Sequence, residues 1–421
     1  MLMDGGVLPG GARAVARCDA LGVAPYSDME GGLYRAYLTP AHDAALTALT
    51  GWMNDAGMTV RRDAAANLIG RYEGSVSGSP ALLIGSHIDS VRDAGCYDGP
   101  LGIMLGIEAV EALHREGKRM PFPIEVIAFG DEEGSRFPAA MLTSRAVAGT
   151  LPPAALDVID GDGVALAEAL AALGHRTDDY LAARRAPGTT LAYLEAHIEQ
   201  GPVLEARGLG IGTVTGIAAQ LRLSAGVTGQ ANHAGTTTMA LRRDAMTGAA
   251  EMMLAIETIA RQDASDLVAT VGRVEALPGA ANVIPGEVRF TIDVRSGDVA
   301  RRDRAAQAIL VALEGIASAR GLTLRLEQVH DLPASPCDPA LMTMMDDAIV
   351  AAGQPPFRLV SGAGHDAMVM ASLCPTAMLF IRCRGGISHN PAEQVEPADV
   401  EIAHQAMLGF IDRLGETFVA A

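Results

Sequence analysis

The sequence lacks any uninterrupted apolar run long enough to cross a membrane. Its first segment, MLMDGGVLPGGARAVARC, also lacks the apolar stretch that follows the basic start of a secretory signal. Both absences disfavour a membrane-spanning or exported protein. We therefore expect the chain to act in the cytoplasm, without a membrane partner.

Cysteine is scarce as well, with five widely spaced residues and no CxxC pair. An odd number without close pairs predicts neither a disulfide framework nor a thiolate zinc site. Cys96 has acidic rather than cationic neighbours, which disfavour a reactive thiolate. We expect all five to be reduced and most to be buried: Cys18, Cys96, Cys337, Cys374 and Cys383.

Basic residues are in deficit, with 32 Lys and Arg against 50 Asp and Glu and a formal net charge of -18. This charge repels nucleic acid and anionic membranes, so we expect no polyanionic partner of that kind. Hydrophobic residues make up 49% of the chain, which is too apolar for disorder. A length of 421 residues exceeds the usual size of one core, so we expect two domains.

The first part of the chain alternates between buried strands and helices. Residues 41–56 carry apolar positions at helical spacing, and a short strand is expected at 59–61. Residues 81–84 form a continuously apolar strand, a helix is expected at 99–116, and 124–129 form another apolar strand. Because open α/β sheets place their sites beyond the carboxyl ends of strands, polar residues after these strands are candidates for a site.

From about Gly210 the pattern changes to amphipathic strands and long helices, which predicts an α+β sandwich with an antiparallel sheet of ferredoxin-like type. We expect the fold class to be α/β. Residues 1–210 and 331–421 would form a mixed, largely parallel-sheet domain, and 211–330 would be inserted in it. The elements expected in or beside the insertion are strands at 220–226, 267–276, 287–295 and 323–329 and helices at 244–262 and 302–320, and the last buried strand of the first domain is expected at 376–381.

Histidines and carboxylates follow the predicted strands. A carboxylate such as Asp98, in a loop rich in Gly, Pro and Asp, can bridge two divalent ions and offset their repulsion. Asp89 lies on the same side of an extended segment as His87, where its carboxylate can accept the second ring N–H. Together these are the residue types that two bridged metal ions and a hydrolytic base require: His87, Asp98, Glu132, Glu133, His197 and His389.

The adjacent Glu132 and Glu133 follow a strand, so their side chains diverge. One can bind a metal while the other takes a proton from a metal-activated water and returns it to a leaving nitrogen. The alternative is an acidic cluster that favours the start of a helix. A single histidine at a strand end is, in the same way, usually structural.

Several ordered motifs cover the chain from about Ala41 to Phe418: GSHIDSVRDAGCYDGPLG, FGDEEGSRF, HIEQGPVLE, ANHAGTTTM, ANVIPG, SGAGHDA and SHNPAE. With these motifs the chain resembles the amidase, hydantoinase/carbamoylase family of the M20-type dinuclear metallohydrolases. The resemblance implies that His87 and His197 bind one metal, that Glu133 and His389 bind the other, and that Asp98 bridges them. Glu132 would be the general base. It also implies a cis peptide bond after the bridging aspartate.

The same resemblance implies a lid and dimerisation role for the inserted domain, and hence a homodimer. His233 would stabilise the oxyanion, and Arg295 with Asn282 would bind the substrate carboxylate. Gln200 and the loop around Gly364 would be further substrate contacts. Asn282 as a turn residue and Arg295 as a surface charge are the alternatives. Thr238 stands where the family commonly has proline, which puts the rigidity of the His233 loop in doubt.

The combined prediction is an amidohydrolase that cleaves the linear C–N bond of an N-carbamoyl (ureido) carboxylate, such as an N-carbamoyl-L-amino acid or allantoate. Zinc is the expected metal, with manganese, cobalt or nickel as alternatives. An aminopeptidase or N-acyl-amino-acid deacylase on the same scaffold is the nearest rival. A metal-free binding protein is the rival from another class.

Overall fold

The computed structural model describes residues 10–419 and divides into two compact units. The first comprises Met1–Thr215, Cys337–Leu359 and Gly364–Ala421, and the second comprises Gly216–Pro336 and Val360–Ala363. The second unit starts and ends a few residues later than the expected 211–330, because residues 211–214 pair with the sheet of the first unit and residues 323–332 pair within the second. Residues 360–363 also belong to it, although the sequence pattern does not mark them.

The first unit is built on one sheet with the order β1-β2-β4-β3-β5-β16-β6. The central strands β4, β3, β5 and β16 run parallel, whereas β1, β2 and β6 are joined to their neighbours in antiparallel pairs. The expected mixed, largely parallel sheet is therefore confirmed. Its strands are β1 (Thr59–Arg62), β2 (Leu68–Tyr72), β3 (Ala81–His87), β4 (Ile124–Phe129), β5 (Thr190–Ile198), β6 (Ile211–Ile217) and β16 (Thr376–Ile381), and β14 (Ser335–Pro336) and β15 (Arg358–Ser361) pair with β6.

Strands β3 and β4 are buried along their whole length, as their continuous apolar sequences predict. β3 runs three residues further than expected, so that its last residue is His87. The candidate histidine is therefore part of the sheet rather than of the following loop. This placement fixes its backbone by ladder hydrogen bonds to β4.

Helices cover this sheet and form the main core of the unit. Helix α3 packs against α1 and against β3 and β5, and α11 packs against α1 and α9. α3 approaches β5 closely at Gly102, where an added Cβ would lie 2.1 Å from the Ala196 oxygen. The helices are α1 (Gly10–Leu21), α2 (Pro40–Asp55), α3 (Pro100–Arg115), α4 (Leu142–Ala148), α5 (Leu166–Ala172), α6 (Val203–Arg207), α9 (Pro339–Ala351), α10 (Asp366–Met370) and α11 (Pro397–Thr417), with 3-10 turns η1 (Pro153–Leu156), η2 (Thr177–Ala183) and η4 (Arg384–Gly386).

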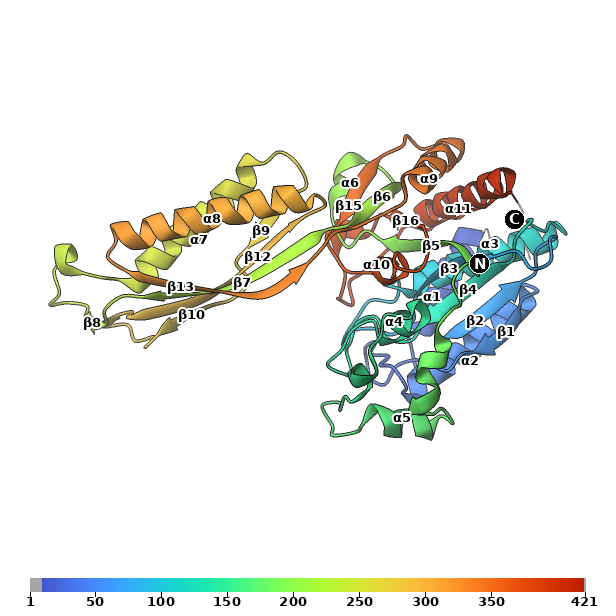
Figure 1. The fold of residues 1–421 in the computed structure, drawn as a ribbon, viewed down its shortest axis with the longest axis horizontal. Coiled ribbons are helices and arrows are strands. Elements are labelled where there is room, and N and C mark those ends of the chain that lie inside the picture. The colour runs from blue at the N-terminus through green and yellow to red at the C-terminus, as the bar shows by residue number, and fades with distance from the viewer. Residues whose placement is uncertain (1–9, 420–421) are drawn as a thin grey trace, which may run out of the picture. The chain divides into compact units, whose positions relative to one another are not determined.

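The second unit is an antiparallel sheet with two long helices beside it (Figure 1). The sheet order is β10-β12-β7-β13, and β9 also pairs with β12. The strand expected at 267–276 is two short strands, because the chain leaves the ladder between residues 270 and 274, around Gly272. The elements are β7 (Ala219–Thr228), β8 (Asn232–His233), β9 (Val268–Thr270), β10 (Val274–Leu277), β11 (Val283–Ile284), β12 (Glu287–Ser296), β13 (Thr323–Leu332), α7 (Ala245–Gln262), α8 (Val299–Ala319) and η3 (Met239–Leu241).

Both long helices of the second unit start at an aspartate cap. Asp244 accepts hydrogen bonds from the backbone of α7, and Asp298 does the same for α8. Their apolar faces join the inner face of the sheet in a separate core. Across residues 10–419, no helix combines the length and apolarity that a membrane span needs.

Candidate metal centre

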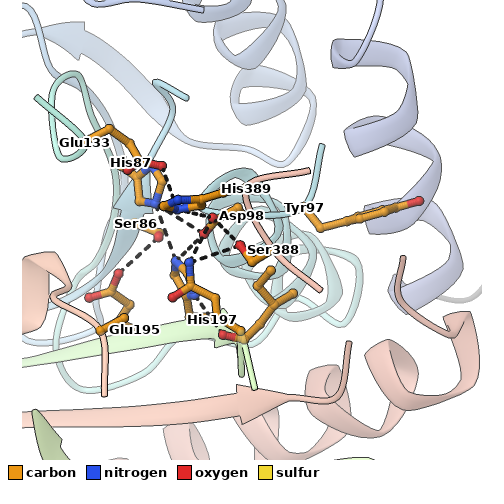
Figure 2. Close-up of polar contacts among 12 residues, drawn as sticks. Ser86, His87, Tyr97, Asp98, Glu133, Glu195, His197, Ser388 and His389 are labelled. Atoms are coloured by element: carbon orange, nitrogen blue, oxygen red, sulfur yellow. Dashed lines mark hydrogen bonds and ion pairs between the residues drawn. The ribbon is translucent and has the colours of Figure 1, made fainter. Parts of the chain in front are cut away.

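The candidate ligands of the first unit converge at the carboxyl ends of the parallel strands (Figure 2). His87 ends β3, His197 lies near the end of β5, and Glu133 follows β4. Asp98 comes from the loop before α3, and His389 from the loop after β16. All five side chains predicted to bind metal are therefore in one place, although they come from five separate segments.

Asp98 lies at the centre of this cluster, with one oxygen facing each half. Its Oδ1 is 3.1 Å from His197 Nε2 and 3.8 Å from His87 Nε2. Its Oδ2 is 3.1 Å from His389 Nε2, which in turn is 3.4 Å from Glu133 Oε1. The cluster thus contains two groups of three potential ligands that share Asp98.

The two buried imidazoles present the same nitrogen to the cluster. His87 Nδ1 lies 3.1 Å from the Asp89 carbonyl oxygen, and His197 Nδ1 lies 2.9 Å from the Ile198 carbonyl oxygen. A nitrogen that donates to a carbonyl carries the proton of the neutral imidazole, so in that form each Nε2 can offer its lone pair to a cation. The two Nε2 atoms are 3.4 Å apart.

Asp89 supports the centre in a different way from the one expected. Its carbonyl, not its carboxylate, lies closest to the His87 ring, since the nearest carboxylate oxygen is 3.5 Å from Nδ1. The carboxylate instead accepts the backbone N–H groups of Glu132 at 3.0 Å and of Glu133 at 3.1 Å. One residue therefore orients both the histidine and the turn that carries the glutamates.

The electrostatics of the cluster show an excess of negative charge. Burial alone would raise the pKa of Asp98, but interactions with the imidazoles of His197 and His389 hold it well below the ordinary value. Burial disfavours the charged form of His87, yet interactions with Asp89 and the neighbouring glutamates raise its pKa well above the ordinary value. The carboxylates therefore draw positive charge into the site.

Glu132 lies at the edge of the cluster, with a potential ligand atom within 4.8 Å of those of His87 and Glu133. Burial is the main cause that raises the pKa of its carboxyl well above the ordinary value, and nearby acidic groups add to this. Gly364 lies beside it, because a Cβ there would be 4.0 Å from Glu132 Oε1 and 3.1 Å from the end of the Met141 side chain. A carboxyl with a raised pKa can both take up and release a proton.

The chain is similar to known proteins over most of its length. The model of the peptidase family M20/M25/M40 matches residues 83–413. An N-carbamoyl-L-amino acid amidohydrolase of Geobacillus stearothermophilus is 42% identical over 92% of this chain and 94% of its own length. An allantoate deiminase of Arabidopsis thaliana is 40% identical over 95% of this chain and 81% of its own length.

The solved structures agree with this result. The crystal structure of a hydantoinase/carbamoylase family amidase from Burkholderia ambifaria matches with a TM-score of 0.90 and 38% identity, over 98% of both chains. The chain belongs to the hydantoinase/carbamoylase group of peptidase family M20/M25/M40. It is accordingly an enzyme, a hydrolase of non-peptide carbon–nitrogen bonds in linear amides.

The donor set of this hydrolase fits divalent metal ions. Asp98 Oδ1 is buried and has no hydrogen-bond partner among the described residues, which is costly unless a cation binds it. Imidazole nitrogens and carboxylate oxygens suit zinc, and also manganese, cobalt and nickel. The surplus of negative charge points to the same kind of ligand.

The backbone after Asp98 differs from the expectation. The cis peptide bonds found in residues 10–419 are Ala24–Pro25 and Leu277–Pro278, so the expected cis bond at Asp98–Gly99 is wrong for this structure. Gly99 makes the turn instead, at a φ of +85°. An added Cβ would lie 2.5 Å from the His87 ring, so only glycine fits here.

Two residues that the sequence assigns to the substrate lie beside the metal cluster. The Gln200 amide donates to Asp98 Oδ2 at 2.9 Å and to Ser388 Oγ at 3.2 Å. Gly364 faces Glu132, as described above. The structure therefore gives Gln200 a contact with the central carboxylate that the sequence does not reveal.

The remaining candidates lie in the second unit, where His233 and Asn282 are exposed. His233 Nδ1 accepts the Gly235 N–H at 3.0 Å, and the Asn282 carbonyl accepts the Ala234 N–H. Thr238 has a φ of -63°, the angle that a proline would impose. Threonine at this position therefore has a backbone φ that proline would also allow.

Arg295 is held in place by Asp293, two residues earlier on β12. Its Nε donates to Asp293 Oδ1 at 2.7 Å, and a second guanidinium nitrogen lies 3.1 Å from Oδ2. The same Oδ2 also accepts hydrogen bonds from Gln220 and Arg222, each at 2.7 Å. Asp293 thus gathers two guanidinium groups and an amide at a cavity of about 570 Å³ in the second unit.

Three buried groups around the cluster have no role in the sequence-based prediction. Glu393 Oε1 accepts the backbone N–H groups of Tyr97 at 2.8 Å and Asp98 at 3.1 Å. Glu195 lies with His197 and His365 in a further group of potential ligands, but it already accepts hydrogen bonds from Ser86, Tyr193 and Ala367. Glu393 and His365 stand inside the quoted motifs SHNPAE and SGAGHDA, which was the available signal.

The cysteines behave as expected. All five are free thiols, and four of them are buried. Burial, followed by the charge of Asp19, raises the pKa of Cys96 to about 12, so this residue stays protonated beside the metal loop. It is not a metal ligand or nucleophile in this state.

Proposed function

We propose that this hydrolase cleaves the linear C–N amide bond of an N-carbamoyl (ureido) carboxylate, such as an N-carbamoyl-L-amino acid or allantoate. The observation that carries the proposal is the double-faced Asp98, with two groups of ligands around it and Glu132 at their edge. The printed names of the relatives add the substrate class. Water adds across the bond, and the carbamoyl end is released as carbon dioxide and ammonia.

Two divalent ions would be held by this chain's own residues. His87 and His197 would bind one, Glu133 and His389 the other, and Asp98 both. When bound, the ions would activate water and polarise the carbonyl group under attack. Zinc is our first choice, because imidazole nitrogens and carboxylate oxygens are common ligands of catalytic zinc.

Glu132 would be the proton carrier of the reaction. It would take a proton from water at the cluster and pass it to the leaving nitrogen, which its raised pKa favours. Asp89 fixes the backbone of Glu132 through the hydrogen bond described above. The base therefore keeps its position through the reaction, without reorganisation of the turn.

The second unit would recognise the substrate. Arg295 would bind the substrate carboxylate with its planar fork, assisted by Asn282, and His233 would donate to the oxyanion. Gln200 and the backbone at Gly364 would contact the substrate from the first unit. As a lid, the second unit would exclude water during catalysis, and as a dimerisation domain it would join two copies of the chain.

We also propose that the protein acts in the cytoplasm. Five free cysteines support a reducing environment such as the cytoplasm. The acidic net charge supports the absence of a nucleic-acid partner.

Ammonia release from a substrate panel tests the proposal. Allantoate, ureidoglycolate, N-carbamoyl-β-alanine and several N-carbamoyl-L-amino acids are compared with dipeptides and N-acetyl-amino acids, with zinc, manganese, cobalt and nickel supplied in turn. For dipeptides and N-acetyl-amino acids, the free amino acid is measured. We expect a ureido carboxylate to give the highest kcat/KM.

The protein with Glu132→Gln is the control for contaminating activity. Faster cleavage of a dipeptide or an N-acetyl-amino acid than of every ureido acid would replace our proposal with the peptidase or deacylase alternative. Equal rates in wild type and Glu132→Gln would show that the measured activity comes from another protein or from another base.

A further inference from the structure

A second cavity lies in the first unit, at the end of the sheet opposite the metal cluster. Its volume is about 690 Å³. The residues before β3 and before β5 line it, through Pro80 and Thr189. Since His87 ends β3 six residues after its start, the two sites lie about 20 Å apart along the strand. None of the residues lining this cavity belongs to the metal cluster.

The cavity concentrates positive charge in an acidic chain. Five arginines line it against two carboxylates, although the whole chain has a net charge of -18. Such a local reversal of charge focuses the field on small anions. The arginines come from β1, β2 and the segment before β5: Arg61, Arg62, Arg71, Arg184 and Arg185.

Both carboxylates in the cavity already have hydrogen-bond or ion-pair partners within the chain. Asp63 is buried and accepts hydrogen bonds from the Ala65 N–H, the Asn67 N–H and the Asn67 amide, each at 2.9 Å. Glu125 is buried and pairs with Arg71 at 2.6 Å and with Arg185 at 2.5 Å. Arg71 also pairs with Glu73 at 2.7 Å. The two glutamates therefore hold the guanidinium groups of Arg71 and Arg185 in fixed positions and offset part of their charge.

Two of the guanidinium groups remain available. The side chains of Arg61 and Arg184 make no hydrogen bond or ion pair with any residue that the structure describes, whereas Arg62 pairs with Asp43 at 2.5 Å. Gly78 and Gly188 line the cavity too, and a Cβ at either position would meet nothing within 4 Å. The cavity thus combines fixed arginines, free arginines and open space.

We propose that this cavity binds a small anion with two or more phosphate groups. The guanidinium fork matches phosphate oxygens in pairs, and several arginines around one space favour several phosphate groups over a single carboxylate. A long polyanion is repelled by the rest of this acidic chain, whereas a compact one fits inside the cavity. The site goes beyond the proposed hydrolysis, because it shares no residue with it.

Calorimetric titration of the full-length protein tests the proposal. Pyrophosphate, ADP, inorganic phosphate, sulfate and citrate are compared at constant ionic strength, with the metal content of the protein measured before and after. We expect saturable binding of pyrophosphate or ADP, and much weaker binding of phosphate and sulfate. A preference for ADP over pyrophosphate would identify a nucleotide, and the reverse would identify an inorganic or simple organic diphosphate.

Variants separate this cavity from other cationic groups. Arg61→Gln combined with Arg184→Gln should weaken diphosphate binding at least about tenfold, because charge-assisted hydrogen bonds are lost. Arg176→Gln is the matched control, since Arg176 is an exposed arginine of the same unit that does not line the cavity. Its affinity should stay within about twofold of wild type, as for a surface substitution without contacts at the site.

Several outcomes would overturn the proposal. These are the absence of saturable binding, equal binding by wild type and the double variant, and tighter binding of citrate than of either diphosphate. A calorimetric signal that accompanies loss of metal, and that is equal in wild type and all variants, would show that the anion chelates metal at the metal centre. This result would also overturn the proposal.

Discussion

The proposed metal cluster and the proposed substrate residues of the second unit differ in burial and in the number of contacts that hold their side chains. His87, Asp98 and His197 are nearly fully buried, at 2%, 5% and 1% exposure, and each is fixed by a neighbouring carbonyl, amide or hydroxyl group. His233 and Asn282 are exposed, and their side chains contact only their own loop or no described partner. The proposed catalytic groups are therefore preorganised, whereas the proposed substrate contacts of the second unit are not.

Arg295 stands between these extremes, because Asp293 holds its guanidinium although the residue is partly exposed. This difference predicts where mutations act. Changes in the cluster should reduce kcat or metal affinity, and changes in the second unit should act on KM and on the choice of substrate.

The largest effect is expected for Glu132→Gln. The amide cannot carry the proton, so kcat should fall by about 10²–10⁴-fold, the range typical of general acid–base catalysis. Metal content and melting temperature should stay at the wild-type values, since glutamine keeps the shape. Steady-state kinetics together with metal analysis give the measurement. A variant with wild-type kcat would remove Glu132 from the mechanism.

Arg295→Gln comes next. Loss of a bidentate contact to a carboxylate should lower kcat/KM by about 10²-fold, mainly through KM. Arg222→Gln is the matched control, because Arg222 also pairs with Asp293 but has no assigned substrate contact. Kinetics on an N-carbamoyl-amino acid and on its neutral amide should show the loss only for the acid. Equal losses on both compounds would assign Arg295 a structural role.

A smaller effect is expected for Glu393→Gln. Glu393 supports the backbone of Asp98, and loss of such supporting contacts weakens metal binding by about tenfold or more. Chelator competition measures the affinity. The control is Glu199→Gln, a buried glutamate that accepts two backbone N–H groups of α6 instead. If both variants bound metal alike, the support by Glu393 would not matter to the cluster.

The smallest effect concerns stability rather than activity. Burial lowers the pKa of His42 from 6.5 to about 3. Between these pH values the imidazole binds a proton in the unfolded chain but stays neutral in the folded chain. The contribution of His42 to stability is fully present well above pH 6.5 and should fall by about 1.4 kcal/mol for each pH unit between 6.5 and about 3.

Urea unfolding at pH 7 and pH 5 measures this contribution. In His42→Leu the loss of stability between the two pH values should be smaller by about 2 kcal/mol. The edge-on contact of His42 with the Tyr37 ring is lost at both pH values and cancels in the difference. An unchanged pH dependence would mean that other groups cause the acid sensitivity.

Local sequence patterns predicted much of the fold. The strands at 124–129 and 376–381 have the expected bounds, because a short apolar run between turn residues has few alternatives. The strand at 267–276 failed, since Gly272 interrupts a pattern that is otherwise continuous. β-Strand ends also depend on partners: β3 extends to His87 because β4 continues beside it.

The sequence predicted the metal-binding residues of the site, but not the residues that hold their backbone in place. His87 ends β3 and Glu133 follows β4, which is a local signal. Glu393 supports Asp98 from 295 residues away along the chain, and no local spacing reports such a contact. In the same way, the contact of the Asp89 carboxylate with the backbone of Glu132 and Glu133 depends on the pairing of β3 with β4.

The sequence by itself determined the residue types of the centre, the two-domain organisation and the family, because motifs and periodicity are properties of neighbouring residues. The tertiary structure decided which oxygen of Asp98 faces which histidine, how Asp89 and Glu393 hold the loops, and that five arginines meet in one cavity. These features arise from packing of segments that are distant in the chain. The directions of these side chains and the distances between them, on which the chemistry depends, are set only when the strands pair.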